Sequence, residues 1–303
     1  MLASSAALAA VGASGAPAFA QTGAAMPTPP VARRIPVTIE QLGRTRVDDY
    51  QWMKDDNWQN VLRDPSLIKA DVREHLEAEN AYREAVLAPT ADLQEAMFNE
   101  MRGRINEDDS SVPSPFGSWE YYARYETGAQ HPFYCRRPKG QTDGEQILLN
   151  ANALAEGKDY SSVGSTSPSP DHRYFVYAED DQGSEVYKIY VKDLTTGALV
   201  GDPIDETVGD FTVSPDSQWL FWTNRDDNGR PNKIFRRPIT GGERALVYEE
   251  TDEGMFMGVG RTSDDAFVVI GIQNQETSET RYIAGSDPTG APTLAEARAE
   301  GTL

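Results

Sequence analysis

A unit of about 45 residues recurs along the chain, and this repeat limits the possible folds more than any other feature of the sequence. The Ser-Pro-Asp sequence at residues 169–171 returns 45 positions later, at residues 214–216. A third copy begins at Ser263-Asp264, 48 positions after the second when measured from Asp216 to Asp264. Each copy continues with a short strand pattern, a polar turn and another strand. This period and strand content are typical of β-propeller blades, which bury their faces against neighbouring blades.

The repeat predicts about four blades, at residues 115–160, 161–207, 208–252 and 253–298. The first blade is a looser copy of the unit and starts with the strand pattern at Trp119–Tyr125. A β-sandwich with similar hairpins is the alternative, but it leaves the constant offset from Ser-Pro-Asp to the following turn unexplained. We therefore expect a mainly β fold in which residues 115–303 form a partial propeller.

A helical segment at residues 35–114 precedes the repeat. We predict a helix from Asp64 to about Ala88, with Asp64 as its cap and Pro65 at its first position. Apolar residues recur every four positions in a second predicted helix, which Gly103 ends: Leu93, Met97 and Met101. We interpret the methionines as core packing at helical spacing.

The first 20 residues have the features of an export signal. They carry no charge and end in Ala18-Phe19-Ala20, a small-x-small cleavage pattern that follows an apolar stretch. The usual basic n-region is missing, and a disordered alanine-rich tail is the alternative interpretation. Residues 21–34 read as a proline- and alanine-rich disordered linker. The sequence thus predicts a periplasmic or secreted protein with a signal peptide at residues 1–20.

The chain is strongly acidic, with 48 acidic and 28 basic residues and a net charge of -20. Nucleic-acid binding needs a basic surface, and anionic membranes repel a negative protein, so we expect neither partner. No run of about 18 apolar residues suggests a membrane span. The charge would attract cationic substrates, although it could equally serve solubility alone.

The single cysteine and the three histidines show no catalytic pattern. Cys135 excludes an internal disulfide and a cysteine zinc cluster, and we interpret it as a small buried hydrophobe. We place His75 on a solvated helix face, and His131 and His172 in turns. The sequence therefore offers no histidine as a general base.

Known catalytic and metal motifs are also missing. The sequence contains neither the Gly-x-Ser-x-Gly nucleophile elbow nor a His-Glu-x-x-His zinc motif. The loop at Asn224–Gly229 resembles a calcium loop, but Phe235 stands where a bidentate Glu is required, so we interpret it as a hairpin turn. Paired acidic residues lie mostly in turns or helix starts, at 48–49, 55–56, 108–109, 180–181, 226–227 and 264–265. We predict no catalytic residue, metal site or cofactor in this chain, and the substrate-binding residues stay unspecified.

One stretch does carry family information. Residues 44–56 (RTRVDDYQWMKDD) resemble the N-terminal signature of the prolyl oligopeptidase family of serine peptidases, and the Leu-x-x-Glu-Asn pattern of that family appears at Leu76–Asn80. Residues 93–104 and 119–137 are most similar to the oligopeptidase B branch. The likeness runs from about residue 35 to residue 290.

This resemblance implies a two-domain peptidase. In the family, a seven-bladed propeller covers the active site of an α/β-hydrolase domain and admits only short peptides, and oligopeptidase B relatives cut after Arg or Lys. The catalytic Ser, Asp and His of the family follow the propeller, whereas this sequence stops at Leu303. We therefore expect the α/β-hydrolase domain to be absent from this chain, which would be a fragment that gates and docks without catalysing.

Two other interpretations stay open at this point. The chain could be a free-standing propeller-type module that binds cationic peptides, or a pseudogene product without a function. For the peptidase interpretation, we expect short, basic peptides and a hydrolase domain encoded downstream as partners.

Overall fold

The computed structural model describes residues 27–299 and residue 301, which form two compact units. The first unit contains the described residues up to Asp56 and Ile68–Glu100, and the second contains Asn57–Leu67 and the residues from Met101 onward. The predicted signal peptide at residues 1–20 and the first part of the predicted linker lie outside the described residues. No helix in the described ranges has the length and apolar character needed to cross a membrane.

The first unit starts with a hairpin that the sequence patterns did not predict. Strand β1 (Val37–Gln41) pairs with β2 (Arg44–Asp48), and the two-residue turn between them has positive φ at both Leu42 (53°) and Gly43 (72°). Such a turn matches the twist of the flanking strands. Helical elements complete this part of the chain: η1 (Gln51–Met53), α2 (Ala70–Leu87), η3 (Ala88–Thr90) and α3 (Ala91–Arg102).

The predicted start of the long helix at Asp64 is wrong. Helix α1 (Trp58–Arg63) has Asp64 as its C-cap, and the 3₁₀ turn η2 (Pro65–Leu67) follows before α2 begins at Ala70. The Asp64 carboxylate does accept the backbone N–H of Ser66, at 2.9 Å. Asp64 therefore has the capping role and Pro65 the first position that the sequence suggests, but they belong to the short turn η2 and not to the long helix.

The predicted core role of the α3 methionines is also wrong. Met97 and Met101 are 51% and 55% exposed, and neighbouring Leu93 and Phe98 are exposed as well. The four-residue spacing correctly placed Leu93, Met97 and Met101 along one side of a helix. Spacing alone could not show whether anything covers that side.

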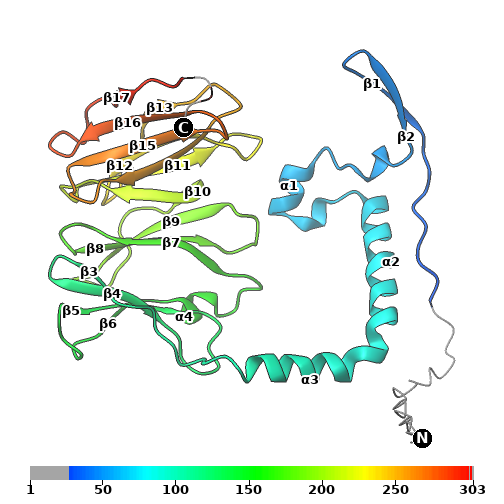
Figure 1. Ribbon diagram of the computed structural model, residues 1–303, viewed down its shortest axis with the longest axis horizontal. Coiled ribbons are helices and arrows are strands. Elements are labelled where there is room, and N and C mark those ends of the chain that lie inside the picture. The colour runs from blue at the N-terminus through cyan, green and yellow to red at the C-terminus, as the bar shows by residue number, and fades with distance from the viewer. Residues whose placement is uncertain (1–26, 300, 302–303) are drawn as a thin grey trace, which may run out of the picture. The chain divides into compact units, whose positions relative to one another are not determined.

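The second unit is built from antiparallel sheets. The first sheet contains β3 (Ser114–Phe116), β4 (Trp119–Arg124), β5 (Phe133–Pro138) and β6 (Gln146–Asn150), and the short helix α4 (Ala151–Ala155) follows. A seven-stranded sheet contains β7 (Ser162–Pro168), β8 (Tyr174–Asp180), β9 (Tyr187–Asp193), β10 (Ile204–Val213), β11 (Trp219–Arg225), β12 (Pro231–Pro238) and β13 (Ala245–Glu249). The last sheet contains β14 (Phe256–Arg261), β15 (Phe267–Gln273), β16 (Ser278–Ala284) and β17 (Thr293–Glu296). Figure 1 shows these sheets following one another in chain order, which confirms the mainly β, blade-like architecture.

Strand β10 joins two successive blades into the seven-stranded sheet. Its first half pairs with β9 (Ile204 with Ile189) and its second half pairs with β11 (Phe211 with Trp222). The register shifts on both sides of Thr207, so the strand bends from one blade into the next.

Apolar clusters fill the spaces between blades. Between the first sheet and β8 lie Leu148, Leu149, Phe175 and Tyr177. A second cluster spans β8 to β11 and includes Val176, Ile189, Val213, Leu220 and Trp222. A third joins β11 and β12 to the last sheet through Phe221, Ile234, Val259, Val268 and Ile270. Each blade is thus buried against its neighbours, as propeller stacking requires.

The repeated Ser-Pro-Asp sequence forms a repeated turn. The hydroxyl of Ser169 accepts the backbone N–H of Tyr174 at 2.8 Å, and Ser214 accepts that of Trp219 at 2.9 Å. In the third copy Thr262 takes this role and accepts the N–H of Phe267 at 3.1 Å, so the structural repeat begins one residue before the Ser263 predicted from the sequence. The side chain therefore fixes the turn that starts the second strand of the blade.

Candidate functional site

The histidine of the repeated turn has a structural role. His172 has a positive φ of 61°, and its Nδ1 lies 2.9 Å from the hydroxyl of Tyr121 on the first sheet. Burial, followed by the charge of Arg136, lowers the pKa of His172 and favours the neutral imidazole. The turn interpretation is confirmed, and the ring ties the first blade to the second.

The other two histidines are also held by structural contacts. His131 lies in the turn between β4 and β5, where its backbone N–H and C=O both bond to the side chain of Asn152, at 3.0 and 2.7 Å. The prediction that His75 lies on a solvated helix face is wrong, because its side chain is only 13% exposed. It contacts the ring of Trp52 edge-on and lies 3.6 Å from Glu79. The sequence pattern of α2 carried no sign that an aromatic residue of the preceding segment covers this position.

Cys135 is a buried thiol, as predicted. It is 1% exposed in β5, and burial, with a further contribution from Glu145, raises its pKa to about 11. Because the thiolate is the reactive form, this environment opposes nucleophilic chemistry.

The calcium-like loop is a hairpin turn. The Asp226 carboxylate accepts the backbone N–H groups of Asn228 and Arg230, both at 2.9 Å, and pairs with the Arg230 guanidinium at 3.1 Å. Its oxygens are thereby engaged within the turn. Within the described part of the chain, no group of three or more His, Cys, Asp or Glu side chains could hold a metal ion.

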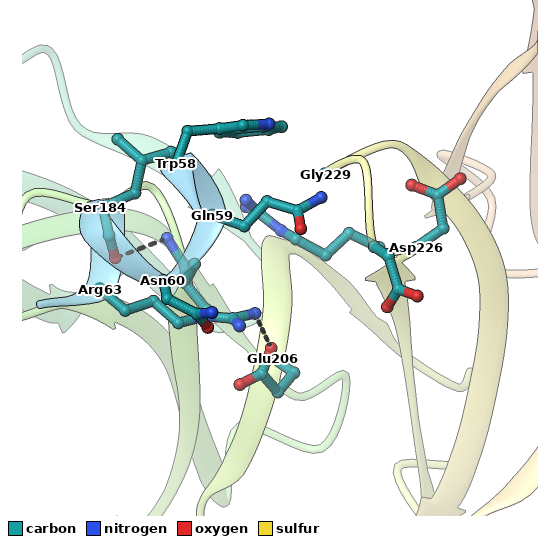
Figure 2. Close-up of a pocket in the computed structure, with 12 residues that line it drawn as sticks. Trp58, Gln59, Asn60, Arg63, Ser184, Glu206, Asp226 and Gly229 are labelled. Carbon is teal, nitrogen blue, oxygen red and sulfur yellow. Dashed lines mark hydrogen bonds and ion pairs between the residues drawn. The ribbon is translucent and has the colours of Figure 1, made fainter. Parts of the chain in front are cut away.

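A cavity of about 280 Å³ lies between α1 and the turns at one end of the second and third blades. All of its lining residues belong to the second unit. They are Trp58, Gln59, Asn60, Leu62, Arg63, Ser184, Val186, Glu206, Arg225, Asp226, Asp227 and Gly229. Figure 2 shows Trp58 and Gln59 of α1 on one side and the turn with Asp226 and Gly229 on the other. We take this cavity as the candidate functional site.

An ion pair holds α1 at this cavity. The guanidinium of Arg63 donates to the Glu206 carboxylate at 2.7 Å (Figure 2). Glu206 lies where β10 bends and has a φ of 61°, a left-handed backbone that is unusual for a glutamate. Such strain is retained where the surrounding structure holds it and is enriched at functional sites.

Arg225 is an incompletely hydrogen-bonded charge in the cavity lining. One terminal nitrogen donates to the backbone carbonyl of Glu185, which also has a positive φ of 58°. The Nε atom is buried and has no hydrogen-bond partner among the described residues. Burial lowers the pKa of Arg225, while the nearby carboxylates of Glu185 and Glu206 oppose this shift.

The cavity lining is suited to binding and not to covalent catalysis. Its hydroxyl group belongs to Ser184 and accepts the backbone N–H of Val186 at 3.3 Å. No histidine, lysine or cysteine is among the lining residues that could activate this serine. Its charged groups, in contrast, include both signs, and the indole of Trp58 is 43% exposed. Sequence reasoning missed this site because its residues come from four separated segments that share no motif.

The chain is similar to known proteins over most of its length. Residues 29–301 match the family described as prolyl oligopeptidase, N-terminal beta-propeller domain. The chain is 36% identical to dipeptidyl aminopeptidase BI of Pseudoxanthomonas mexicana over 284 residues, which cover 88% of this chain and 38% of that protein. It is 29% identical to protease 2 of Moraxella lacunata over 283 residues, covering 90% of this chain and 39% of the relative.

A solved structure gives the same result in three dimensions. Oligopeptidase B from Leishmania major superimposes with a TM-score of 0.81 at 28% identity, covering 90% of this chain and 40% of that one. The chain thus spans less than half the length of each of these three relatives. The antiparallel blades described above correspond to a propeller domain that relatives carry as part of a longer protein.

Proposed function

Because the chain belongs to the prolyl oligopeptidase family of peptidases, we propose that it is the propeller portion of an oligopeptidase-B-like serine endopeptidase that hydrolyses short peptides after Arg or Lys. In this proposal the chain gates access and docks to a hydrolase domain, and it does not catalyse. The observation that carries the proposal is the family match over residues 29–301. Similarity to protease 2 and to oligopeptidase B supports this branch of the family.

The charge of the propeller supports a basic substrate. The candidate cavity and a neighbouring hollow are lined by several carboxylates: Asp181, Asp205, Glu206, Asp226 and Asp227. With a net charge of -20, the surface attracts cationic peptides and repels acidic ones. Gating would therefore favour the peptides that the proposed cleavage preference requires.

The test uses the product from its native host, purified with an antibody against the helical segment. We expect a protein of at least twice 33.4 kDa that cleaves an Arg-containing fluorogenic peptide and is blocked by a serine-directed inhibitor. The 303-residue chain alone should show no turnover above buffer. A host product near 33 kDa without peptidase activity would overturn the peptidase proposal and favour the free-standing module for cationic peptides.

One observation favours a second candidate, the release of dipeptides from N-termini. The relative at 36% identity is named dipeptidyl aminopeptidase BI. The same host product distinguishes the two candidates when it is given an N-acetylated and a free version of one Arg-containing peptide. An endopeptidase cleaves both, whereas an aminopeptidase needs the free amino terminus.

Export is a separate part of the proposal. The apolar, uncharged stretch that ends at Ala20 supports a signal peptide and a periplasmic or secreted location. N-terminal sequencing of the mature host protein should begin at or near Gln21. A mature protein that begins at Met1 would overturn this part.

A further inference from the structure

We propose that α1 is a movable strap whose position is controlled by an exchange of ion pairs at Glu206. In the closed arrangement, which the structure shows, Arg63 of α1 holds the Glu206 carboxylate. In the open arrangement Glu206 would pair with Arg225 of β11, and α1 would leave the turns of the second and third blades. This inference deepens the proposed function, because it names the element that would gate access, and it rests on that function only for its purpose.

Helix α1 has little that holds it in place. It has six residues, none of them buried, and Trp58 and Leu62 are 43% and 53% exposed. A helix this short is not stable by itself in water. Among the described residues, Arg63 is the only residue of α1 whose side chain bonds to a blade. The position of α1 therefore depends strongly on one ion pair.

The ion pair of Arg63 with Glu206 is suited to opening. The guanidinium donates to the carboxylate at 2.7 Å (Figure 2), and the two side chains are 45% and 55% exposed. Exposed ion pairs are weak, and dissolved salt screens them further. Ionic strength should therefore shift α1 between its bound and its released position.

Arg225 supplies the second arrangement. Burial lowers the pKa of Arg225, and among the smaller influences Glu206 raises this pKa and Arg63 lowers it, so the three charges lie close together. One terminal nitrogen of Arg225 donates to the backbone carbonyl of Glu185. The other terminal nitrogen, Nη1, bonds to no described residue, and Arg225 forms no ion pair in the described part of the chain. Glu206 thus has a second cation beside it that no carboxylate occupies.

Release of α1 would change the shape of this end of the blades. The cavity of about 280 Å³ adjoins the neighbouring hollow, which measures about 410 Å³, and the two have four lining residues in common: Arg63, Ser184, Val186 and Glu206. The pair of Arg63 with Glu206 therefore lies in the wall between them. When this pair breaks and α1 leaves, the two spaces join into one open groove. An element with two discrete arrangements is what a gate requires.

The test follows hydrogen exchange of residues 58–63 in the 303-residue chain by mass spectrometry, at low and at high NaCl concentration. We expect exchange to be at least about threefold faster at high salt, because the exposed ion pair is screened. Arg63→Gln and Glu206→Gln should exchange fast at both salt concentrations. Arg46→Gln is the matched control, since it breaks the exposed pair of Arg46 with Asp48 in β2 and should leave exchange of residues 58–63 unchanged.

The decisive variant is Arg225→Gln. It removes both the competitor for Glu206 and the repulsion of Arg63, so exchange of residues 58–63 at low salt should become at least about twofold slower, opposite to the effect of Arg63→Gln. Arg225→Lys keeps the competing charge and should exchange like the unchanged chain. Thermal melting shows whether each variant is folded, and Arg225→Met, which removes the charge but keeps an apolar stem, gives the same prediction if Arg225→Gln does not fold.

Two results would overturn the proposal. Exchange that does not depend on salt in the unchanged chain would show that the ion pair does not control α1. Unchanged or faster exchange in the Arg225 variants that lack the charge would show that Arg225 does not compete for Glu206. Because no turnover is measured, a failure here leaves the peptidase test of the host product independent.

Discussion

The outward faces of the first and last sheets differ in how they are covered. On the first sheet, the face turned away from β8 carries a polar cover of five side chains: Glu120, Tyr122, Arg124, Arg137 and Glu145. The Glu145 carboxylate accepts from the Arg124 guanidinium at 2.9 Å and from the Tyr122 hydroxyl at 2.6 Å, and Arg137 pairs with Glu120 at 3.0 Å. This face satisfies its polar groups within its own sheet.

The outward face of the last sheet has no such cover among the described residues. Phe256 and Phe267 are 53% and 36% exposed, and a hollow of about 770 Å³ runs along β14 and β15. Gly260 and Gly271 contribute no side chain to this face, and a Cβ added at either position would meet no atom within 4 Å. The inner face of the same sheet is fully buried, with Ile270 at 0% exposure.

This difference shows that the sheets are not equivalent units. Each propeller blade needs a neighbour on both faces, or a substitute for it. The polar cover of the first sheet is such a substitute, because its charged and hydrogen-bonded side chains can face water without exposing the apolar residues beneath them. The open apolar face of the last sheet is suited to contact with another protein surface.

The largest effect expected from this comparison concerns Cys135, which pairs in register with Tyr122 and lies beneath the polar cover. The raised pKa, about 11, lowers the thiolate fraction at pH 8, and the 1% exposure of the side chain limits access by a reagent. We therefore expect the native chain to react with a disulfide reagent at least 100-fold more slowly than the urea-unfolded chain. Tyr122→Ala should remove much of this protection. Native and unfolded rates within tenfold of each other would show that the cover does not shield the thiol.

The next effect contrasts the two faces of the last sheet. Ile270→Ala should lower the free energy of unfolding by about 3 kcal/mol, because it opens a cavity in the buried cluster. Val269→Ala changes the adjacent position on the open face and should cost about 1 kcal/mol or less. Urea unfolding of both variants measures the difference. Equal losses would mean that the open face is covered in solution.

The repeat was the part of the fold that the sequence predicted best. Each turn needs a side-chain hydroxyl that accepts the backbone N–H of the residue five positions later. Ser169 and Ser214 meet this need, so a serine recurs at the same position of each blade and can be recognised in the sequence. Thr262 satisfies the same requirement, which explains why the third copy was located one residue late. Local hydrogen bonding of this kind is visible in a sequence because it depends on a few neighbouring residues.

The candidate site could not be predicted in this way. Glu206 and Arg225 line the cavity only because β10 bends between blades and α1 lies beside the turns. Burial is similarly a tertiary property, which is why Met97 was expected in a core and His75 on a solvated face. Periodicity gives the direction of a side chain, but the element that covers it comes from elsewhere in the chain.

The open face of the last sheet predicts self-association of the 303-residue chain. Exposed apolar surface and strand edges favour contact between copies, and a doubly changed chain, Phe256→Ser with Val269→Thr, should raise the dissociation constant about tenfold. Ile147→Ser is the matched control, since Ile147 is 49% exposed on the polar outward face of the first sheet. Sedimentation velocity over a range of concentrations measures the association. A sharp monomer in the unchanged chain would contradict the prediction.

The smallest effect tests the polar cover itself. The guanidinium of Arg124 lowers the pKa of Glu145, and the hydrogen bond from Tyr122 adds to this. A carboxylate with a lowered pKa in the folded state stabilises above its unfolded pKa, and this contribution is lost as the pH falls through the folded value. Glu145→Gln should therefore cost about 1 kcal/mol at pH 7, a value kept small because the pair is partly exposed. In urea unfolding, the difference from the unchanged chain should shrink as the pH is lowered from about 5 to 3, whereas Glu243→Gln, at an exposed position, should have little effect at either pH. A cost that stays constant with pH would show that the carboxylate charge does not hold the cover together.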